Sequence, residues 1–337
     1  MIKIALDAMG GDNAPHDVVH GGIEAARVSK GKFEVVLVGD KEKIEREVAR
    51  HFRTQDLPIS IVHASQIVEM NEHPATALKQ KKDSSIAVAV RLHKEGKVDA
   101  VVSAGNTGAV MASALFGLRR VECIRRPAIG SILPTESGRM LLLDVGANVD
   151  SRPQDLLQFG IMGSIFYSSI FDEPNPKVGL LSVGEEEIKG NDLVLKTRAL
   201  FEKSTLNFIG NVEGGDILKG TAHVVVCDGF VGNIVLKFAE SLHSLFKSSM
   251  RQLVRRYIFS QLGAVLMKPT FDGIRKIFDY QEYGGAPLLG VQGTCIIAHG
   301  RSTPKAIKNA VLVADKMIQE RVNDHIKQQV KELACKD

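Results

Sequence analysis

Short runs of apolar, often β-branched residues recur along the chain and alternate with longer stretches of helical periodicity. The runs that we predict as strands are Ile2–Leu6, Glu34–Val38, Ile59–His63, Asp99–Val102, Ala128–Leu133, Met140–Leu143, Lys177–Leu181, Asn207–Ile209, His223–Val226 and Cys295–Ala298. Most intervals hold one helical pattern, as over Asp17–Val28, Lys41–His51, Ser84–Glu95, Asp155–Ile170 and Asp192–Glu202. Continuous apolar strands that alternate with helices are typical of a buried, mostly parallel sheet covered on both faces. The pattern therefore predicts an α/β/α sandwich.

Three spacings depart from this alternation. Only a short polar segment separates Leu133 from Met140, which is too little for a parallel crossover, so these two strands are predicted to be antiparallel. A long, mostly helical stretch predicts a helical pair or protrusion near residues 240–280. The chain from Pro304 onward predicts one long helix, with Thr303 as its cap and Pro304 at the first helical position.

Composition narrows the class of protein. The 337 residues are 44% hydrophobic and 24% charged, which suits a folded protein of one large domain or about two smaller ones. A net charge of +4 is too small to indicate a nucleic-acid partner. The four cysteines show no CxxC spacing, so we expect a reducing, cytoplasmic compartment. Asp7 interrupts any signal-peptide pattern, and the uncharged run Ala100–Leu118 contains a glycine-rich polar segment that would break a spanning helix.

Five loops rich in Gly, Asn, Asp, Ser and Thr follow predicted strands. They are residues 7–12, 103–108, 144–150, 183–191 and 228–233. Helix capping and tight turning are the common roles of any one such loop. Backbone N–H groups of strand-end loops and helix N-termini also bind anions. Because all five are predicted at the same end of one sheet, together they predict a cleft for a small, highly charged anion.

Several familiar signatures do not occur in the sequence. The chain contains no GxGxxG, GxxxxGK[ST], GxSxG or HExxH pattern, which weighs against a dinucleotide, P-loop, serine-hydrolase or zinc-protease site. His16 and His20 lie one helical turn apart and could pair on a metal, and aspartates of the polar loops could gather around Mg²⁺. Nothing in the spacing requires either site, so we predict no metal and no cofactor.

A basic cluster of Lys79, Lys81 and Lys82 precedes a predicted helix start. A solvated face is the common interpretation of such a cluster, and a docking surface is the alternative. The docking alternative would require a partner with an acidic surface.

A second basic segment covers residues 250–280, where six basic residues stand against two acidic ones among bulky apolar side chains. This pattern fits a helix pair in a dimer or core, or a basic amphipathic element on an anionic membrane. The membrane alternative places Leu262, Leu266, Arg255 and Arg256 at the lipid surface.

Several long motifs occur in a specific order along nearly the whole chain. They are Asp7-Ala8-Met9-Gly10-Gly11-Asp12, Ser103-Ala104-Gly105-Asn106-Thr107-Gly108-Ala109, Leu143-Asp144-Val145-Gly146-Ala147-Asn148, Asp228-Gly229-Phe230-Val231-Gly232-Asn233, Tyr283-Gly284-Gly285-Ala286 and Ala298-His299-Gly300. Read in this order, the sequence resembles the bacterial phosphate acyltransferases of phospholipid synthesis, which are acyl-acyl-carrier-protein:phosphate acyltransferases.

The resemblance implies an isocitrate/isopropylmalate-dehydrogenase-like fold, shared with phosphate acetyltransferases, in one family unit over residues 1–337. We divide this unit into a subdomain of residues 1–125 plus 290–337 and a subdomain of residues 126–289, with the site in the cleft between them. The resemblance also implies a homodimer. The basic and apolar segment 250–280 predicts that it is peripherally associated with the inner face of the membrane. Its substrates would be a long-chain acyl-carrier-protein thioester and inorganic phosphate, and its products acyl phosphate and free carrier protein. We predict that the carrier protein, which is strongly acidic in this pathway, docks on Lys79, Lys81 and Lys82. A membrane-bound glycerol-3-phosphate acyltransferase would consume the acyl phosphate.

In such a reaction phosphate is itself the nucleophile, so the protein has to hold the dianion near the thioester carbonyl and stabilise the oxyanion. The resemblance implies Lys189 and Asn233 as the catalytic residues. The loop residues expected to bind phosphate are Ser103, Gly105, Asn106, Thr107, Gly108 and Asn148.

Three alternatives stay open at the level of sequence. A phosphate acetyltransferase that uses acetyl-CoA would need the same phosphate site with a nucleotide pocket. A decarboxylating NAD-dependent dehydrogenase shares the implied fold, and fold alone does not decide function. A non-catalytic scaffold at the membrane surface would use residues 250–280.

Overall fold

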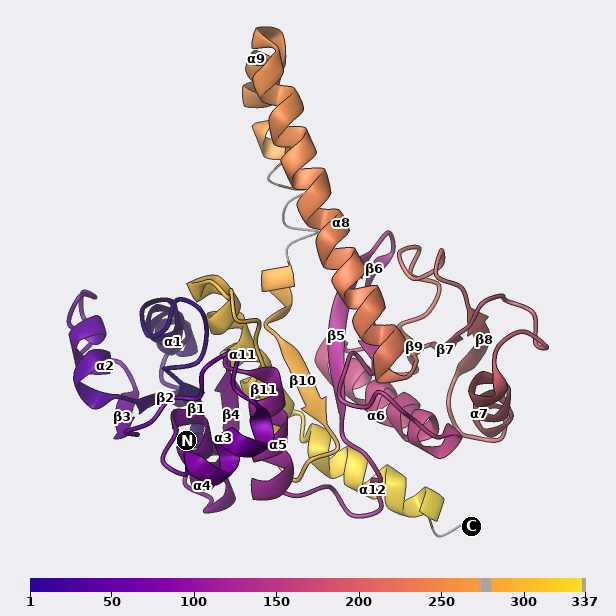
Figure 1. The fold of residues 1–337 in the computed structure, drawn as a ribbon, viewed down its shortest axis with the longest axis horizontal. Helices are drawn as coiled ribbons and strands as arrows, with labels where there is room; N and C mark the ends of the chain where they lie inside the picture. The colour runs from indigo at the N-terminus through magenta and orange to yellow at the C-terminus, as the bar shows by residue number, and fades with distance from the viewer. Residues whose placement is uncertain (272, 274–279, 335–337) are drawn as a thin grey trace.

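The computed structural model describes residues 1–271, 273 and 280–334, and within them the strands form one eleven-stranded sheet in the order β3-β2-β1-β4-β11-β10-β5-β6-β9-β7-β8 (Figure 1). The strands are β1 Ile2–Asp7, β2 Phe33–Gly39, β3 Ile59–His63, β4 Ala100–Ser103, β5 Ala128–Thr135, β6 Gly138–Leu143, β7 Val178–Leu181, β8 Phe208–Val212, β9 Val224–Val226, β10 Ala286–Leu289 and β11 Thr294–Ile297. All the predicted strands are present, whereas β10 was not predicted.

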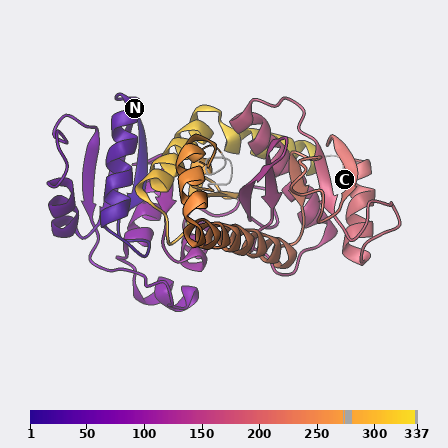
Figure 2. The ribbon, with the colours of Figure 1, turned by 90° about the horizontal axis from the view of Figure 1, so that it is seen from above.

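Helices pack on both faces of the sheet (Figure 2). They are α1 His16–Ser29, α2 Lys41–Val48, α3 Pro74–Gln80, α4 Ser85–Lys94, α5 Thr107–Gly117, α6 Pro153–Phe171, α7 Asp192–Glu202, α8 Gly229–Arg256, α9 Ile258–Leu266, the short 3₁₀ helix η1 Tyr280–Tyr283, α11 Pro304–Gln319 and α12 Val322–Ala334. In β1, Ile4 and Leu6 join one apolar cluster, with residues of α1, α6, α11 and α12, and Ala5 joins the other, with residues of α4 and α5. Both faces of the strand are buried because its side chains alternate, so the predicted α/β/α sandwich is confirmed.

Strand direction reverses in the middle of the sheet. β10 is antiparallel to both β11 and β5, and β5 is antiparallel to β6, as the short connection predicted. β6, β9 and β7 then run parallel to one another and opposite to β1 and β4. The prediction that all five polar loops lie at the same end of the sheet is therefore wrong. The loops after β1 and β4 leave one end of the sheet, and the loops after β6, β7 and β9 leave the opposite end.

The C-terminal segment forms two helices instead of the one predicted. α11 packs on α1, and α12 packs on α6. Arg321 between them has a φ of 49°, in the left-handed region that a right-handed helix does not include. Pro304 opens α11 as predicted, and Thr303 occupies the cap position, but its hydroxyl bonds to Gln281 and not to the α11 backbone.

A helical protrusion stands out from the sheet, as predicted. α8 runs away from the sheet and α9 lies at its far end (Figure 1). Large side chains such as Ile234, Phe238 and Leu242 are exposed along α8, and their spacing places them on one face of the helix. Residues 272 and 274–279, which complete the predicted segment and include Arg275 and Lys276, lie outside the described residues.

Candidate active site

Three loops that follow strands meet at one end of the sheet. The loops after β1 and β4 touch through their backbones, since a Cβ added at Gly10 would lie 2.6 Å from the backbone nitrogen of Gly105. The N–H of Asp12 donates a 2.8 Å hydrogen bond to the carbonyl of Gly300, in the loop after β11. The glycines of these motifs therefore permit a close approach of three backbones.

A buried pair of side chains lies beneath this first loop cluster. The Ser103 hydroxyl donates a 2.6 Å hydrogen bond to Oδ2 of Asp7 and accepts a 3.1 Å bond from the N–H of Gly105. Burial raises the pKa of Asp7, and the hydrogen bond from Ser103 partly offsets that rise. Ser103, expected to bind phosphate, therefore supports the backbone of the loop that follows β4 in this structure.

The N-terminus of α5 presents the other candidate loop residues. Asn106 Oδ1 accepts the N–H of Ala109 at 3.0 Å, and its Nδ2 donates to the carbonyl of Glu72 at 3.0 Å. Asn106 is thus both the cap of α5 and a tether to the preceding loop. Thr107 and Gly108 occupy the first helical turn, where backbone N–H groups have no intrahelical acceptor. Because Thr107 is exposed, this end of α5 offers a hydroxyl and backbone donors to an anion.

A second loop cluster forms around Asp144 at the opposite end of the sheet. Its Oδ1 accepts the N–H groups of Ile129 and Ala147 at 3.0 and 3.1 Å, and its Oδ2 accepts the backbone and side-chain nitrogens of Asn148 at 2.7 and 3.0 Å. Burial raises the pKa of Asp144, with the Ala147 hydrogen bond opposing the rise. The Asn148 amide also donates to the carbonyl of Pro127 at 2.7 Å, so both of its amide hydrogens are occupied. Asn148 therefore holds this loop in place.

Lys189 and Asn233 also lie at this end of the sheet. Lys189 is in the loop after β7, and Asn233 is near the start of α8, which follows β9. Asn233 is half-buried on α8, and its Cβ lies 3.6 Å from the position that a Cβ on Gly146 would take. The Lys189 carbonyl accepts the Ser182 hydroxyl at 3.2 Å, which anchors the loop. The Lys189 side chain is exposed and makes no ion pair within the described residues. An ammonium group and an amide are both donors that a phosphate or a developing oxyanion accepts.

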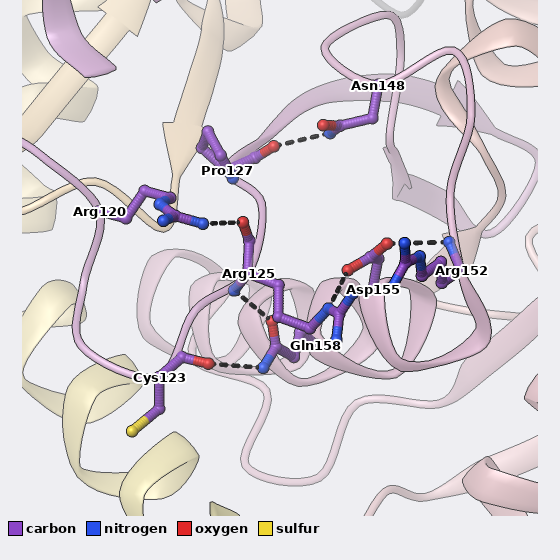
Figure 3. Close-up of polar contacts among 8 residues, drawn as sticks. All are labelled: Arg120, Cys123, Arg125, Pro127, Asn148, Arg152, Asp155 and Gln158. Carbon is purple, nitrogen blue, oxygen red and sulfur yellow. Dashed lines mark hydrogen bonds and ion pairs between the residues drawn. The ribbon is translucent and has the colours of Figure 1, made fainter. Parts of the chain in front are cut away.

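A hollow of about 600 Å³ lies beside Asn148, between α5 and the start of α6. Figure 3 labels several of its lining residues, among them Arg120, Arg125 and Arg152. Its wall includes four arginines that the sequence analysis did not single out: Arg120, Arg125, Arg126 and Arg152. A signal existed, because two arginine doublets, at 119–120 and 125–126, stand just before β5. Charge pattern alone does not distinguish a cavity wall from a solvated loop, which is why the site was missed.

The three lysines predicted to dock a carrier protein differ in their surroundings. Lys79 and Lys82 are exposed, and α3, which carries Lys79, packs on α5. Lys81 is half-buried, forms an ion pair with Glu72 and donates to the carbonyl of Ile67 at 2.7 Å. Lys81 therefore ties down the loop before α3, and two of the three lysines remain open to a partner.

The far end of the protrusion carries exposed apolar and basic side chains together. Phe259 is 85% exposed and Leu266 is 77% exposed, with Arg255 and Arg256 exposed nearby in the sequence. Leu262 lies in α9, but its side chain is outside those that the structure describes. Among the described helices, none has the length and apolar character needed to cross a bilayer.

The histidines weighed as metal ligands have other neighbours. His16 Nδ1 lies 3.1 Å from a carboxylate oxygen of Glu47, and the ring of His20 lies 4.7 Å from that of His51. In the described part of the chain, no three His, Cys, Asp or Glu side chains gather as a metal site would require.

The mostly parallel sheet with helices on both faces defines the α/β class of proteins. The structure resembles a phosphotransacetylase from Streptococcus pyogenes, with a TM-score of 0.64 at 19% identity over 95% of this chain and 94% of that one. It also resembles a branched-chain phosphotransacylase from Enterococcus faecalis V583, with a TM-score of 0.58 at 13% identity over 94% and 99% of the two chains. At these identities the likeness establishes the fold alone.

The chain belongs to the family described as fatty acid synthesis protein, whose model matches residues 2–325. A phosphate acyltransferase from Dictyoglomus turgidum is 50% identical over 327 residues, which are 96% of each chain. A phosphate acyltransferase from Heliobacterium modesticaldum is 51% identical over 332 residues, covering 96% of this chain and 98% of that protein. The resemblance that the loop motifs predicted is confirmed.

Proposed function

We propose that this protein transfers a long-chain acyl group from acyl carrier protein to inorganic phosphate, giving acyl phosphate and free carrier protein. The observation that carries the proposal is 50% identity, over 96% of the chain, to a protein named phosphate acyltransferase within a fatty acid synthesis family. A membrane-bound glycerol-3-phosphate acyltransferase is the proposed consumer of the acyl phosphate.

In the proposed reaction a phosphate oxygen bonds to the thioester carbonyl carbon, the C–S bond then breaks, and the carrier thiolate leaves and takes up a proton. We propose that Lys189 and Asn233 stabilise the negative charge on phosphate and the charge that develops on the carbonyl oxygen. The N–H groups of Thr107 and Gly108, at the start of α5, are the proposed hydrogen-bond donors to the bound phosphate. Gly105 lets this loop approach the loop that follows β1 closely. Ser103, Asn106 and Asn148 act by holding these loops.

We place the site in the cleft between the subdomains of residues 1–125 plus 290–337 and residues 126–289, with the first loop cluster in one subdomain and the second in the other. α5 supports this arrangement because it begins in the first cluster, at Thr107, and its later residues Met111 and Leu115 line the hollow beside Asn148.

The test is to incubate the protein with a long-chain acyl-carrier-protein thioester and phosphate, and to trap acyl phosphate with hydroxylamine. Acyl hydroxamate should form only when both substrates are present, since phosphate is the nucleophile. A parallel reaction with acetyl-CoA examines the acetyltransferase alternative. A higher kcat/KM for acetyl-CoA than for the acyl carrier would replace the proposal with that alternative.

We further propose that the protein works as a homodimer in peripheral contact with the cytoplasmic face of the membrane. The exposed apolar face of α8 suits a second copy of the chain, and the exposed end of α9 beside Arg255 and Arg256 suits an anionic lipid surface. Such contact would deliver a product with a long apolar tail directly to a membrane enzyme.

A further inference from the structure

The hollow beside Asn148 is lined by both apolar and charged side chains. Met111 and Leu115 of α5 are among the apolar ones. The four arginines line it together with Asp150 and Asp155, which leaves an excess of positive charge around the space. A volume of about 600 Å³ falls in the usual range for small-molecule sites and is far more than one inorganic phosphate needs. The hollow therefore suits an elongated ligand with an anionic group.

The four arginines differ in the contacts that their guanidinium groups already make. Arg125 Nε lies 2.9 Å from Oδ1 of the buried Asp155, and Arg120 donates to the carbonyl of Arg125 (Figure 3). Arg126 and Arg152 are exposed and make no ion pair within the described residues. These two guanidinium groups are the ones able to take a ligand anion, and a guanidinium can bind phosphate through two parallel hydrogen bonds.

The arginine segment is held from both sides. Gln158 of α6 accepts the N–H of Arg125 at 2.9 Å through its Oε1 and donates to the carbonyl of Cys123 at 2.8 Å (Figure 3). Asn148 holds the other end through its 2.7 Å bond to the carbonyl of Pro127. Asp155 accepts the backbone N–H of Arg152 at 2.8 Å. The backbone that carries Arg126 and Arg152 is therefore held in place before a ligand arrives, which lowers the entropic cost of binding.

We propose that this hollow binds the phosphate group of a pantetheine 4′-phosphate arm, with Arg126 and Arg152 as the phosphate ligands and α5 against the arm. The inference rests on the proposed function, because a carrier-protein thioester is presented on such an arm. Coenzyme A carries the same group, so the shared chemistry is the pantetheine phosphate. The two arginines would set the specificity for the acyl donor and take no part in the attack by inorganic phosphate.

The test compares binding of two fluorescent probes, 4′-phosphopantetheine and pantetheine without its phosphate, by fluorescence anisotropy with the full-length protein. The wild type should bind the phosphorylated probe at least about tenfold more tightly, the scale of one charge-assisted phosphate contact. Arg126→Gln and Arg152→Gln should each reduce that preference by about tenfold, and Arg126→Lys should retain part of it. Arg119→Gln is the matched control, because Arg119 is an exposed arginine of the same segment that does not line the hollow.

Equal binding of the two probes by the wild type, or an unchanged preference in both glutamine variants, would overturn the proposal. Displacement of the probe by inorganic phosphate at its KM would also overturn it, since the hollow would then be the nucleophile site. Competition by carrier protein and by coenzyme A, each tested separately, identifies which of them supplies the arm. The binding assay involves no reaction, so the two proposals can fail separately. If the protein forms no acyl phosphate, the proposed function is wrong but the binding result still holds. If the probes do not bind as expected, this inference is wrong but the proposed function still holds.

Discussion

The hydroxyl of Ser103 lies 2.6 Å from Oδ2 of Asp7, and these two residues are also register partners at the ends of β4 and β1. Ser103 extends the link to the loop, because its Oγ accepts the N–H of Gly105. The loop that leads from β4 into α5 is therefore held in place by a buried carboxylate on the neighbouring strand.

Ser103→Ala should lower the free energy of unfolding by about 1–3 kcal/mol, because it leaves a buried carboxylate oxygen and the Gly105 N–H without this partner. Ser113→Ala is the matched control. Ser113 Oγ is buried in α5 with no hydrogen-bond partner in the described structure, so its removal should be nearly neutral. Urea unfolding of both variants measures the difference. Equal losses would show that the Asp7 contact has no special weight.

Asp7→Asn should change how stability depends on pH. Burial raises the pKa of Asp7 above 3.8, so the folded protein holds this proton more tightly than the unfolded chain does. The stability that Asp7 contributes is then greatest below pH 3.8 and is lost as pH rises through the raised pKa. The free energy of unfolding of the wild type minus that of the variant should fall as pH increases from 3.8. Urea titrations from the acid limit of stability to neutrality measure it, and a difference that grows with pH contradicts the expectation.

Lys189→Ala and Asn233→Ala should each lower acyl phosphate formation by about 100-fold while the protein stays folded, the scale of a lost oxyanion donor. The hydroxylamine assay gives turnover, and circular dichroism checks the fold. Lys196→Ala serves as control, because Lys196 is an exposed lysine of the following helix that pairs with Asp192. Near-normal turnover in either folded variant would remove that residue from the mechanism.

Lys79→Glu combined with Lys82→Glu should raise KM for the acyl carrier by about tenfold at low salt, and the effect should shrink as salt screens the charges. Lys81 is left unchanged because its ion pair with Glu72 supports the loop. The control is Lys30→Glu with Lys32→Glu, two exposed lysines between α1 and β2. A KM that ignores both salt and the Lys79/Lys82 variant would exclude this surface as the docking site.

Phe259→Glu combined with Leu266→Glu should abolish flotation of the protein with anionic vesicles, since both side chains are exposed at the end of the protrusion. Phe52→Glu is the control, because Phe52 is 77% exposed and lies after α2, outside the protrusion. Size-exclusion chromatography reports assembly in parallel. A double variant that still floats, or one that separates into monomers, would assign the segment to assembly instead of membrane contact.

The sequence predicted those parts of the fold that local pattern determines. The apolar runs located buried strands because both faces are covered, and the short segment between Leu133 and Met140 required an antiparallel pair. The polar loops were also located correctly. Their placement at one end was wrong because it assumed that the strands before these loops all run the same way. β10 is antiparallel to both β11 and β5, so those two strands share one direction, and the direction reverses at the antiparallel pair of β5 and β6 that the short connection predicted.

Other features depend on contacts that are distant in sequence. β10 has four residues and contains Pro287, which argues against a central strand, yet it lies between β11 and β5. Arg321 ends one helix and precedes another without a glycine or proline to mark the break. The arginine-lined hollow required α5 and the start of α6 to be brought together, so its residues could not be selected from their spacing.

The central position of β10 and β11 sets an order on synthesis of the chain. β4 and β5 are consecutive strands in the sequence, but the sheet separates them with strands made only when translation reaches residues 286–297. Until then, the nascent chain carries two open sheet edges at its future centre, and open edges invite pairing with other chains. A chain truncated before residue 286 would keep both edges open, so premature termination should yield aggregates and not a smaller working enzyme.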